Sequence, residues 1–262
     1  MLPLPDLIDI LAPVMRSAGR LIEAVREAGF ETRGKADASP VTEADERAEL
    51  LLTAALAAAD PYTPIVGEEA HAAGHRPPPS DRFWLIDALD GTRDFIAGRP
   101  AYSVNIGLIN HGRPVLGLVL CPRNGMLWAG AEGHGAFRQA PGEGREWIAA
   151  RGFTVPPAVV VSHSHLDAET KDYLTRLGLV ELEPTGSSLK FCRLAEGTAD
   201  VYPRYGPTME WDTAAGHAIL LAAGGAMRSP GGSDFAYGKP GYRNGGFLAV
   251  GDAAAFKVLP EL

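Results

Sequence analysis

Apolar side chains recur at helical spacing along the first 29 residues, which predicts an amphipathic helix that ends near Gly29. This stretch has no early basic region and contains Asp6 and Asp9, so it does not resemble a signal peptide. A second helix is expected over residues 43–60, with Thr42 as its N-cap. The segment between the two helices is expected to be extended.

Short apolar runs bounded by turn signals predict strands. One run, at 63–70, ends in carboxylates, and another, at 83–90, leads to a helix start at Gly91 and Thr92. From 102 to 138, β-rich runs are broken by turn signals at hairpin spacing, which predicts an antiparallel meander of about four strands. Residues 133–138 are expected to form one of its hairpin turns.

The second half of the chain alternates strand and helix patterns, which is typical of an α/β unit. Strands are expected at 157–163, 179–185 and 200–205, and helices at 167–178, 187–199 and 211–225. A last strand at 247–251 precedes a terminal helix. We therefore expect an α/β (α+β) fold with an N-terminal half, 1–145, and a C-terminal half, 146–262, in one compact unit.

Composition excludes several classes of protein. Hydrophobic residues make up 46% of the 262 residues, and the formal net charge is −8, so no global basic field is available for nucleic acid. Cys121 and Cys192 have no zinc-site spacing and argue against a disulfide framework, which favours a reducing, cytoplasmic compartment. No run approaches the roughly 18 apolar residues of a membrane-spanning helix. An anionic substrate would need local cations.

Carboxylates follow or interrupt several of the predicted buried strands. Singly, each could be a solvated loop residue or a helix cap. Two carboxylates about 4 Å apart repel by roughly 4 kcal/mol at an effective dielectric of 20, so a converging group would need a cation or altered protonation. Oxygen-only ligands favour a hard cation, with Mg²⁺ first, Mn²⁺ as a substitute and Ca²⁺ as a competitor. The acids are Glu68, Glu69, Asp87, Asp90 and Asp212.

The stretch from Asp87 to Thr92 combines two binding functions. Asp87 and Asp90 lie three residues apart across a strand-to-helix bend, and the carbonyl of Leu89 lies between them. Gly91 and Thr92 would present backbone N–H groups at a helix N-terminus, which favours a phosphate. The sequence therefore predicts a platform for metal and phosphate.

Three segments resemble the signatures of the inositol monophosphatase superfamily of Mg²⁺-dependent, Li⁺-sensitive phosphatases: 67–69, 87–95 and 210–218. Residues 35–45, 186–216 and 242–244 look more like the bacterial 3′(2′),5′-bisphosphate nucleotidases of the CysQ type. Such enzymes convert 3′-phosphoadenosine 5′-phosphate to AMP and phosphate. The resemblance implies a layered α-β-α-β-α sandwich.

The resemblance also implies a role for individual residues. Glu68, Asp87, the Leu89 carbonyl and Asp90 would build the first metal positions, and Asp212 would join the aspartates at a second. Asp45 and Thr92 would activate the attacking water beside Glu68. The main chain of Gly91 and Thr92 would bind the scissile phosphate. The rest of the substrate would be held by Ser187, Ser188, Lys190 and Asp212. Arg204 or Tyr205 would line the nucleotide side.

The cofactor implied is two or three Mg²⁺ per site, with inhibition by Li⁺ and Ca²⁺. A homodimer is expected from the resemblance. Peripheral association with the inner membrane is left open, although no basic amphipathic face is present to drive it. His163 and His165 are expected at a strand end and helix cap, and His217 in packing or in substrate contact.

The sequence departs from the family pattern in two places: Ala88 stands where proline is usual, and the pair Arg93-Asp94 stands where a lysine or threonine with an acid is usual. Ala88 removes no ligand, but Arg93 adds a cation beside the phosphate site and leaves substrate preference open. The alternatives are an inositol-1-phosphate or sugar phosphatase, including one for fructose-1,6-bisphosphate, a broad-specificity enzyme, and a non-catalytic sensor.

Overall fold

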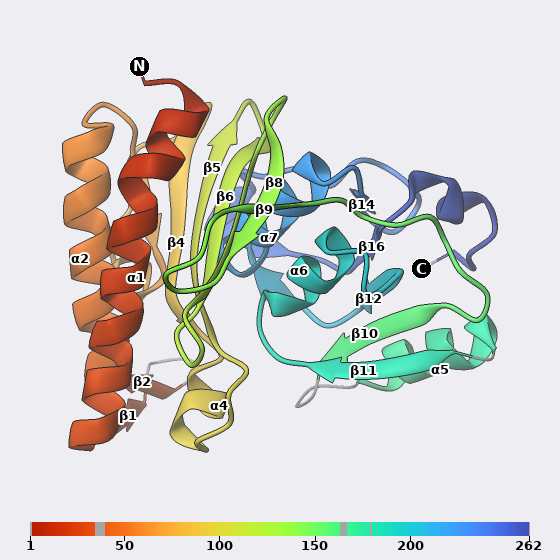
Figure 1. The fold of residues 1–262 in the computed structure, drawn as a ribbon, viewed down its shortest axis with the longest axis horizontal. Helices are drawn as coiled ribbons and strands as arrows, with labels where there is room; N and C mark the ends of the chain where they lie inside the picture. The colour runs from red at the N-terminus through yellow and green to blue at the C-terminus, as the bar shows by residue number, and fades with distance from the viewer. Residues whose placement is uncertain (1, 35–39, 163–166, 179, 262) are drawn as a thin grey trace.

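Helices and sheets alternate in the order α-β-α-β-α across the molecule (Figure 1). The computed structural model describes residues 2–34, 40–162, 167–178 and 180–261. Helices α1 (Leu4–Ala28) and α2 (Glu43–Ala59) cover one face of a seven-stranded sheet. Helices α6 (Leu189–Ala195) and α7 (Glu210–Ala222) lie between that sheet and a five-stranded sheet. The predicted layered sandwich is confirmed.

The seven-stranded sheet has its strands in chain order, with β3 parallel to β4 and every later pair antiparallel. The predicted four-stranded meander is confirmed as β5 to β8, and the turn between β7 and β8 falls at residues 132–134. The strands are β3 (Ile65–Gly67), β4 (Arg82–Asp90), β5 (Ser103–Asn110), β6 (Arg113–Cys121), β7 (Met126–Ala131), β8 (Gly135–Gln139) and β9 (Glu146–Ile148).

The five-stranded sheet has the order β11-β10-β12-β16-β14. Strand β10 runs parallel to β11 and β12, whereas β16 is antiparallel to both of its neighbours. Helix α5 (Ala168–Leu177) and the 3₁₀ segment η2 (Ala253–Lys257) pack on its outer face. The strands are β10 (Ala158–Ser162), β11 (Glu181–Thr185), β12 (Val201–Arg204), β14 (Ala226–Arg228) and β16 (Phe247–Val250).

Short elements complete the described chain. Two small antiparallel pairs join β1 (Thr32–Gly34) to β2 (Pro40–Thr42) and β13 (Thr208–Met209) to β15 (Arg243–Asn244). The remaining elements are α3 (Glu68–Ala72), α4 (Thr92–Ile96) and the 3₁₀ turn η1 (Pro240–Tyr242).

Several element boundaries differ from the sequence prediction. The terminal helix is only the 3₁₀ segment η2, and the helix after Gly91 has five residues. Strand β9 extends the first sheet to Ile148, while the division into two halves stays a prediction. Asp167 caps α5 by accepting the Thr170 N–H, but His163 and His165 lie outside the described residues.

Cys121 and Cys192 are both buried and free. Within the described ranges, no helix has the length and apolar character needed to cross a bilayer.

Helix α7 contacts the first sheet at positions where the strands carry glycine. A Cβ atom at Gly117 of β6 would lie 2.1 Å from the carbonyl oxygen of Ala215, and one at Gly107 of β5 would lie 2.7 Å from the Ala214 Cβ. Because these glycines have no side chain, the helix backbone rests directly on the sheet. This close packing brings the N-terminal turn of α7 to the end of β4, where Asp87 and Asp90 lie.

The substitution Gly117→Ala should lower the free energy of unfolding by about 1–3 kcal/mol, the usual cost of an overpacked core. Its added methyl group must displace the α7 backbone rather than a flexible side chain. The matched control is Gly144→Ala, since nothing lies within 4 Å of a Cβ at Gly144. Thermal unfolding of the two variants measures the difference, and equal midpoints would contradict the close packing.

Candidate active site

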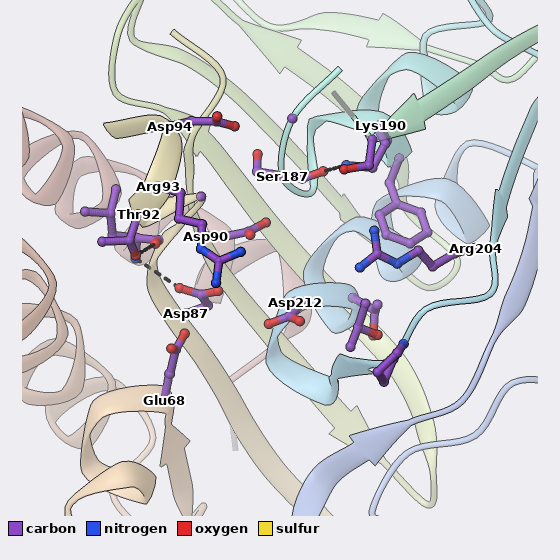
Figure 2. Close-up of a pocket in the computed structure, with 18 of the residues that line it drawn as sticks. Glu68, Asp87, Asp90, Thr92, Arg93, Asp94, Ser187, Lys190, Arg204 and Asp212 are labelled. Atoms are coloured by element: carbon purple, nitrogen blue, oxygen red, sulfur yellow. Dashed lines mark hydrogen bonds between the residues drawn. The ribbon is translucent and has the colours of Figure 1, made fainter. Parts of the chain in front are cut away.

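One pocket gathers most of the predicted site residues. It has a volume of about 410 Å³ and opens between the two sheets, at the end of β4 (Figure 2). Its walls come from β4, α4, the turn before α6, β12 and the first turn of α7. The predicted residues among its lining are Glu68, Asp87, Leu89, Asp90, Gly91, Thr92, Ser187, Lys190, Arg204 and Asp212.

An irregular strand end turns β4 toward the pocket. Asp87 pairs with Asn105 of β5, and Asp90 pairs with Ser103, so β4 has one residue more than its partner between these pairs. Such a bulge bends a strand and re-aims its side chains. Gly91 follows with φ of +94°, a left-handed conformation that glycine adopts at little cost. The predicted bend is therefore a β-bulge followed by a left-handed glycine.

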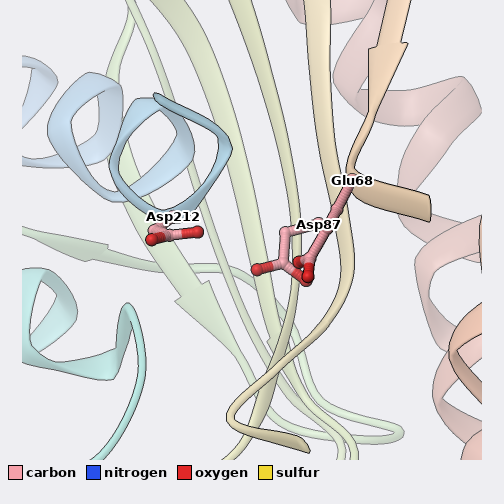
Figure 3. Close-up of side chains that lie close together, drawn as sticks. All are labelled: Glu68, Asp87 and Asp212. Atoms are coloured by element: carbon pink, nitrogen blue, oxygen red, sulfur yellow. The ribbon is translucent and has the colours of Figure 1, made fainter. Parts of the chain in front are cut away.

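Three carboxylates meet in the pocket: Glu68 at the start of α3, Asp87 on β4 and Asp212 on α7 (Figure 3). One oxygen from each lies within 4.8 Å of the others. Carboxylate oxygens at this spacing match the donors that a hard cation prefers. This acidic cluster could hold a metal ion.

The acids of the pocket resist being charged together. Burial raises the pKa of Asp212 well above its ordinary value, and the charges of Asp90 and Glu68 raise it further. Burial also raises the pKa of Asp90 to about 6, although Lys190, the Ser188 N–H and Asn105 oppose the shift. A bound cation would offset this repulsion, so the electrostatics agree with the spacing of the cluster.

Asp90 is supported on the side away from the pocket by buried polar residues of β5 and by Ser188, the N-cap of α6. The Ser188 N–H donates to Asp90 Oδ2 at 2.7 Å, and the Ser188 hydroxyl donates to Asn105 Oδ1 at 2.6 Å. Ser103 Oγ lies 2.8 Å from Ser188 Oγ. Ser188 is therefore buried behind Asp90 and is not part of the pocket lining, and its contact with substrate stays a prediction. Sequence reasoning missed Asn105 and Ser103, whose signal was two polar residues on one face of an apolar strand.

Thr92 connects the pocket to α2. Its hydroxyl group lies 3.0 Å from Asp45 Oδ1 and 3.1 Å from the Leu89 carbonyl oxygen. The other Asp45 oxygen accepts the N–H and hydroxyl of Thr42, in the capping box that begins α2. Asp45 is buried and does not line the pocket, and its hydrogen bond with Thr92 links it to a residue that does.

Cations lie on two sides of the acidic cluster. Figure 2 shows Arg93 on one side and Lys190 with Arg204 on the other. Lys190 Nζ donates to the Ser187 carbonyl at 2.6 Å, and burial lowers the Lys190 pKa to about 8. Ser187 has φ of +49°, and its buried hydroxyl has no partner among the described residues. Tyr205 lies outside the pocket, where its hydroxyl accepts from Arg176.

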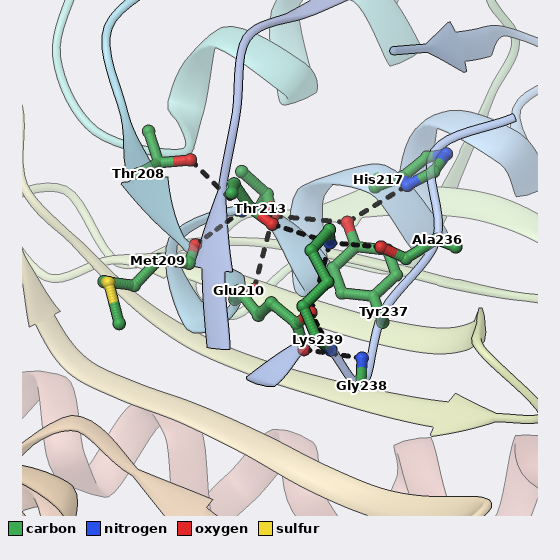
Figure 4. A network of polar contacts seen from close by, with 10 residues as sticks. Thr208, Met209, Glu210, Thr213, His217, Ala236, Tyr237, Gly238 and Lys239 are labelled. Carbon is green, nitrogen blue, oxygen red and sulfur yellow. Dashed lines mark hydrogen bonds and ion pairs between the residues drawn. The ribbon is translucent and has the colours of Figure 1, made fainter. Parts of the chain in front are cut away.

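A buried network fixes the first turn of α7 (Figure 4). Glu210 accepts the N–H groups of Gly238 and Lys239 at 2.8 and 2.9 Å, and Tyr237 donates its hydroxyl proton to Thr213. His217 Nδ1 lies 3.0 Å from the Tyr237 hydroxyl, outside the pocket lining. His217 therefore has the packing role, and burial lowers its pKa to about 3, which keeps the ring neutral.

The layered fold with an acidic pocket at the end of β4 defines a known family. Residues 6–257 match the model of the inositol monophosphatase family, so the chain belongs to it, as the three signatures predicted. The 3′(2′),5′-bisphosphate nucleotidase CysQ of Escherichia coli K12 is 43% identical over 220 residues, which cover 83% of this chain and 88% of that protein. The Buchnera aphidicola protein of the same name is 34% identical over 93% of each chain.

Solved structures agree with this assignment. The crystal structure of CysQ from Bacteroides thetaiotaomicron matches with a TM-score of 0.78 and 34% identity, covering 94% of this chain and 97% of that one. A Thermotoga maritima IMPase, at 23% identity and a TM-score of 0.79, shares the fold. The predicted resemblance to CysQ-type proteins is confirmed.

Replacing Asp212 with asparagine should stabilise the metal-free protein at pH 8. Asparagine removes one repelling charge and keeps an oxygen that can accept the Met209 N–H, which lies 2.8 Å from Asp212 Oδ2. Carboxyls with a raised pKa favour the fold at low pH and lose that contribution as pH rises through the folded-state pKa, which is about 6 for Asp90. The advantage of the variant should therefore shrink between pH 8 and pH 5.

Calorimetry in the presence of a chelator measures this effect, which we expect to be on the order of 1 kcal/mol, or about 2–4 °C. The control is Asp81→Asn, since the Asp81 side chain is 83% exposed. A variant that unfolds below the wild type at pH 8 would show that the acids do not repel as described.

Proposed function

We propose that this protein is a Mg²⁺-dependent phosphomonoesterase that removes the 3′(2′)-phosphate of 3′-phosphoadenosine 5′-phosphate, giving AMP and phosphate. One observation carries the proposal: the carboxylates of Glu68, Asp87 and Asp212 meet in a pocket that cations flank on two sides. A bisphosphate could place one phosphate at the metal-binding cluster and the other beside the cations. The 43% identity with proteins named 3′(2′),5′-bisphosphate nucleotidase supports this substrate class.

The residues present fit a hard cation, because every ligand available in the cluster is an oxygen. Glu68, Asp87, the Leu89 carbonyl, Asp90 and Asp212 would hold it, and we propose two or three ions per site. Bound Mg²⁺ would supply Lewis-acid stabilisation of phosphate charge and lower the pKa of a coordinated water. Mn²⁺ would substitute, while Li⁺ and Ca²⁺ would inhibit.

Asp45 and Thr92 would handle the proton of the attacking water. A Thr92 hydroxyl that donates to Asp45 Oδ1 leaves its lone pairs free to accept a proton from the pocket. The proton of the water would pass to Thr92 Oγ1 as Thr92 passes its own proton to Asp45. Glu68, on the other side of Asp87, would help to orient this water.

The main chain of Gly91 and Thr92 would bind the scissile phosphate. Helix α4 has only five residues, so this contact would rest on the amide donors rather than on a long helix dipole. The wall formed by Ser187, Lys190 and Arg204 is the proposed site of the second phosphate. It offers a buried hydroxyl without a partner among the described residues, together with two cations.

Phosphate release from 3′-phosphoadenosine 5′-phosphate should exceed release from inositol-1-phosphate and fructose-1,6-bisphosphate by at least about tenfold in kcat/KM. Inositol-1-phosphate has no second phosphate for the wall of Ser187, Lys190 and Arg204, and fructose-1,6-bisphosphate has no adenosine to add contacts in the pocket. The assay compares the three substrates with Mg²⁺, with added Li⁺ and with the variant Asp90→Asn, which should retain less than about 1% of the activity. A preference for inositol-1-phosphate would keep the metal site and reject the nucleotide. No release from any substrate would favour a non-catalytic sensor.

Because Asp45 acts through Thr92, the variants Thr92→Ala and Asp45→Asn should each lower kcat by about 10²–10⁴-fold, and the double variant should lose little more. Thr92→Ser, which keeps the hydroxyl, should recover most of the rate. Thr175→Ala is the matched control, since Thr175 is exposed on α5. Additive losses in the double variant would show that the two residues act independently.

The cytoplasm is the compartment we propose, and the two buried free cysteines support a reducing environment. We also propose a homodimer, which sedimentation of the purified protein would test.

A further inference from the structure

Helix α2 carries a second buried acid one turn after Asp45. Residues four apart lie on the same face of a helix, so Glu49 faces the site side of α2 as Asp45 does. Glu49 is only 5% exposed. Its two carboxylate oxygens accept the N–H groups of Glu69 and Ala70, each at 2.8 Å. These N–H groups belong to the first turn of α3, the helix that begins with Glu68.

The residue on the other side of Glu68 is fitted to the same carboxylate. A Cβ atom at Gly67 would lie 2.5 Å from Glu49 Cδ. Gly67 has φ of −104° and ψ of 151°, a conformation that any residue adopts. Glycine at position 67 therefore provides room for the Glu49 carboxylate rather than backbone freedom. Glu68 is bracketed by two neighbours that both contact Glu49.

The segment around Glu68 is built from short elements, and His71 of α3 packs on Trp211 and Tyr242. Strand β3 has three residues and lies at the edge of its sheet, and α3 has five residues with none buried. Few buried apolar contacts make a segment locally unstable. Helix α2 is well packed, so the two charge-assisted hydrogen bonds that Glu49 accepts would fix the position of α3.

We propose that Glu49 is a positioning residue that fixes the carboxylate of Glu68 at the metal cluster. Glu49 acts on the backbone of Glu69 and Ala70, and the effect reaches the metal through Glu68. This role rests on the proposed function in one respect, namely that Glu68 binds a metal ion.

The variant Glu49→Gln tests this role, because glutamine keeps the shape but can accept with only one oxygen and turns an N–H group toward a donor. The dissociation constant for Mg²⁺, measured by calorimetry on the substrate-free protein, should rise by about 10–100-fold, as is usual for groups that orient a metal ligand. The matched control is Glu43→Gln on the same helix, whose side chain is 58% exposed and should leave the constant unchanged.

The activity of the variant separates positioning from general damage. Saturating Mg²⁺ should return kcat to within about threefold of the wild type, whereas a misfolded protein would not recover. Glu49→Asp, which keeps the charge and retracts it by one methylene, should fall between the wild type and Glu49→Gln in Mg²⁺ affinity.

Gly67→Ala provides an independent variant if Glu49→Gln fails to fold. Its methyl group would push the Glu49 carboxylate away, so we expect a similar loss of Mg²⁺ affinity with Glu49 intact.

Two outcomes would overturn the inference: unchanged Mg²⁺ affinity in folded Glu49→Gln, or a weakened kcat that saturating Mg²⁺ does not restore. The failure of the proposed function looks different. In that case the wild type itself would bind no Mg²⁺, or it would bind Mg²⁺ and release no phosphate from any of the substrates. If the wild type binds Mg²⁺, the affinities of the variants for Mg²⁺ still decide the role of Glu49.

Discussion

The mutual repulsion of carboxylates in one buried pocket is the constraint on which the rest of the structure depends. Glu68, Asp87 and Asp212 come from three separate segments, and one oxygen of each lies within 4.8 Å of the others. Burial and neighbouring charge raise the pKa of Asp212 well above its ordinary value. Such an arrangement costs folding free energy until a cation is bound, so the surrounding scaffold must hold the acids in place against it.

The scaffold meets this demand with contacts at each acid. Asp212 stands on α7, which rests on the glycine positions of β5 and β6 and is held at its first turn by Glu210. Asp90 is supported by the amide of Ser188. Helix α2 supports the pocket at two points. Asp45 accepts a hydrogen bond from Thr92, and Glu49 accepts hydrogen bonds from the first turn of α3. Acids that repel are thus fixed by groups outside the pocket.

Much of the fold and part of the site could be predicted from local patterns. The N-cap role of Thr42 and the meander of β5 to β8 depend on neighbours in sequence or on adjacent strands, so a pattern reveals them. The roles of Asn105 and Glu49 depend on partners far along the chain, so no local pattern predicts them. The two adjacent serines differ in the same way, because Ser187 lines the pocket while the buried Ser188 side chain donates to Asn105.

The sequence by itself determined the kind of chemistry, since oxygen ligands without cysteine or paired histidine leave only hard cations, and the signatures carry the family. It also determined the bend after β4, because a glycine follows two aspartates where a strand must turn. Only the tertiary structure decided which acids meet, which serine faces the pocket and which acid supports α3. The physical reason is that these contacts join segments many residues apart, and side-chain direction at such meeting points is set by packing rather than by local preference.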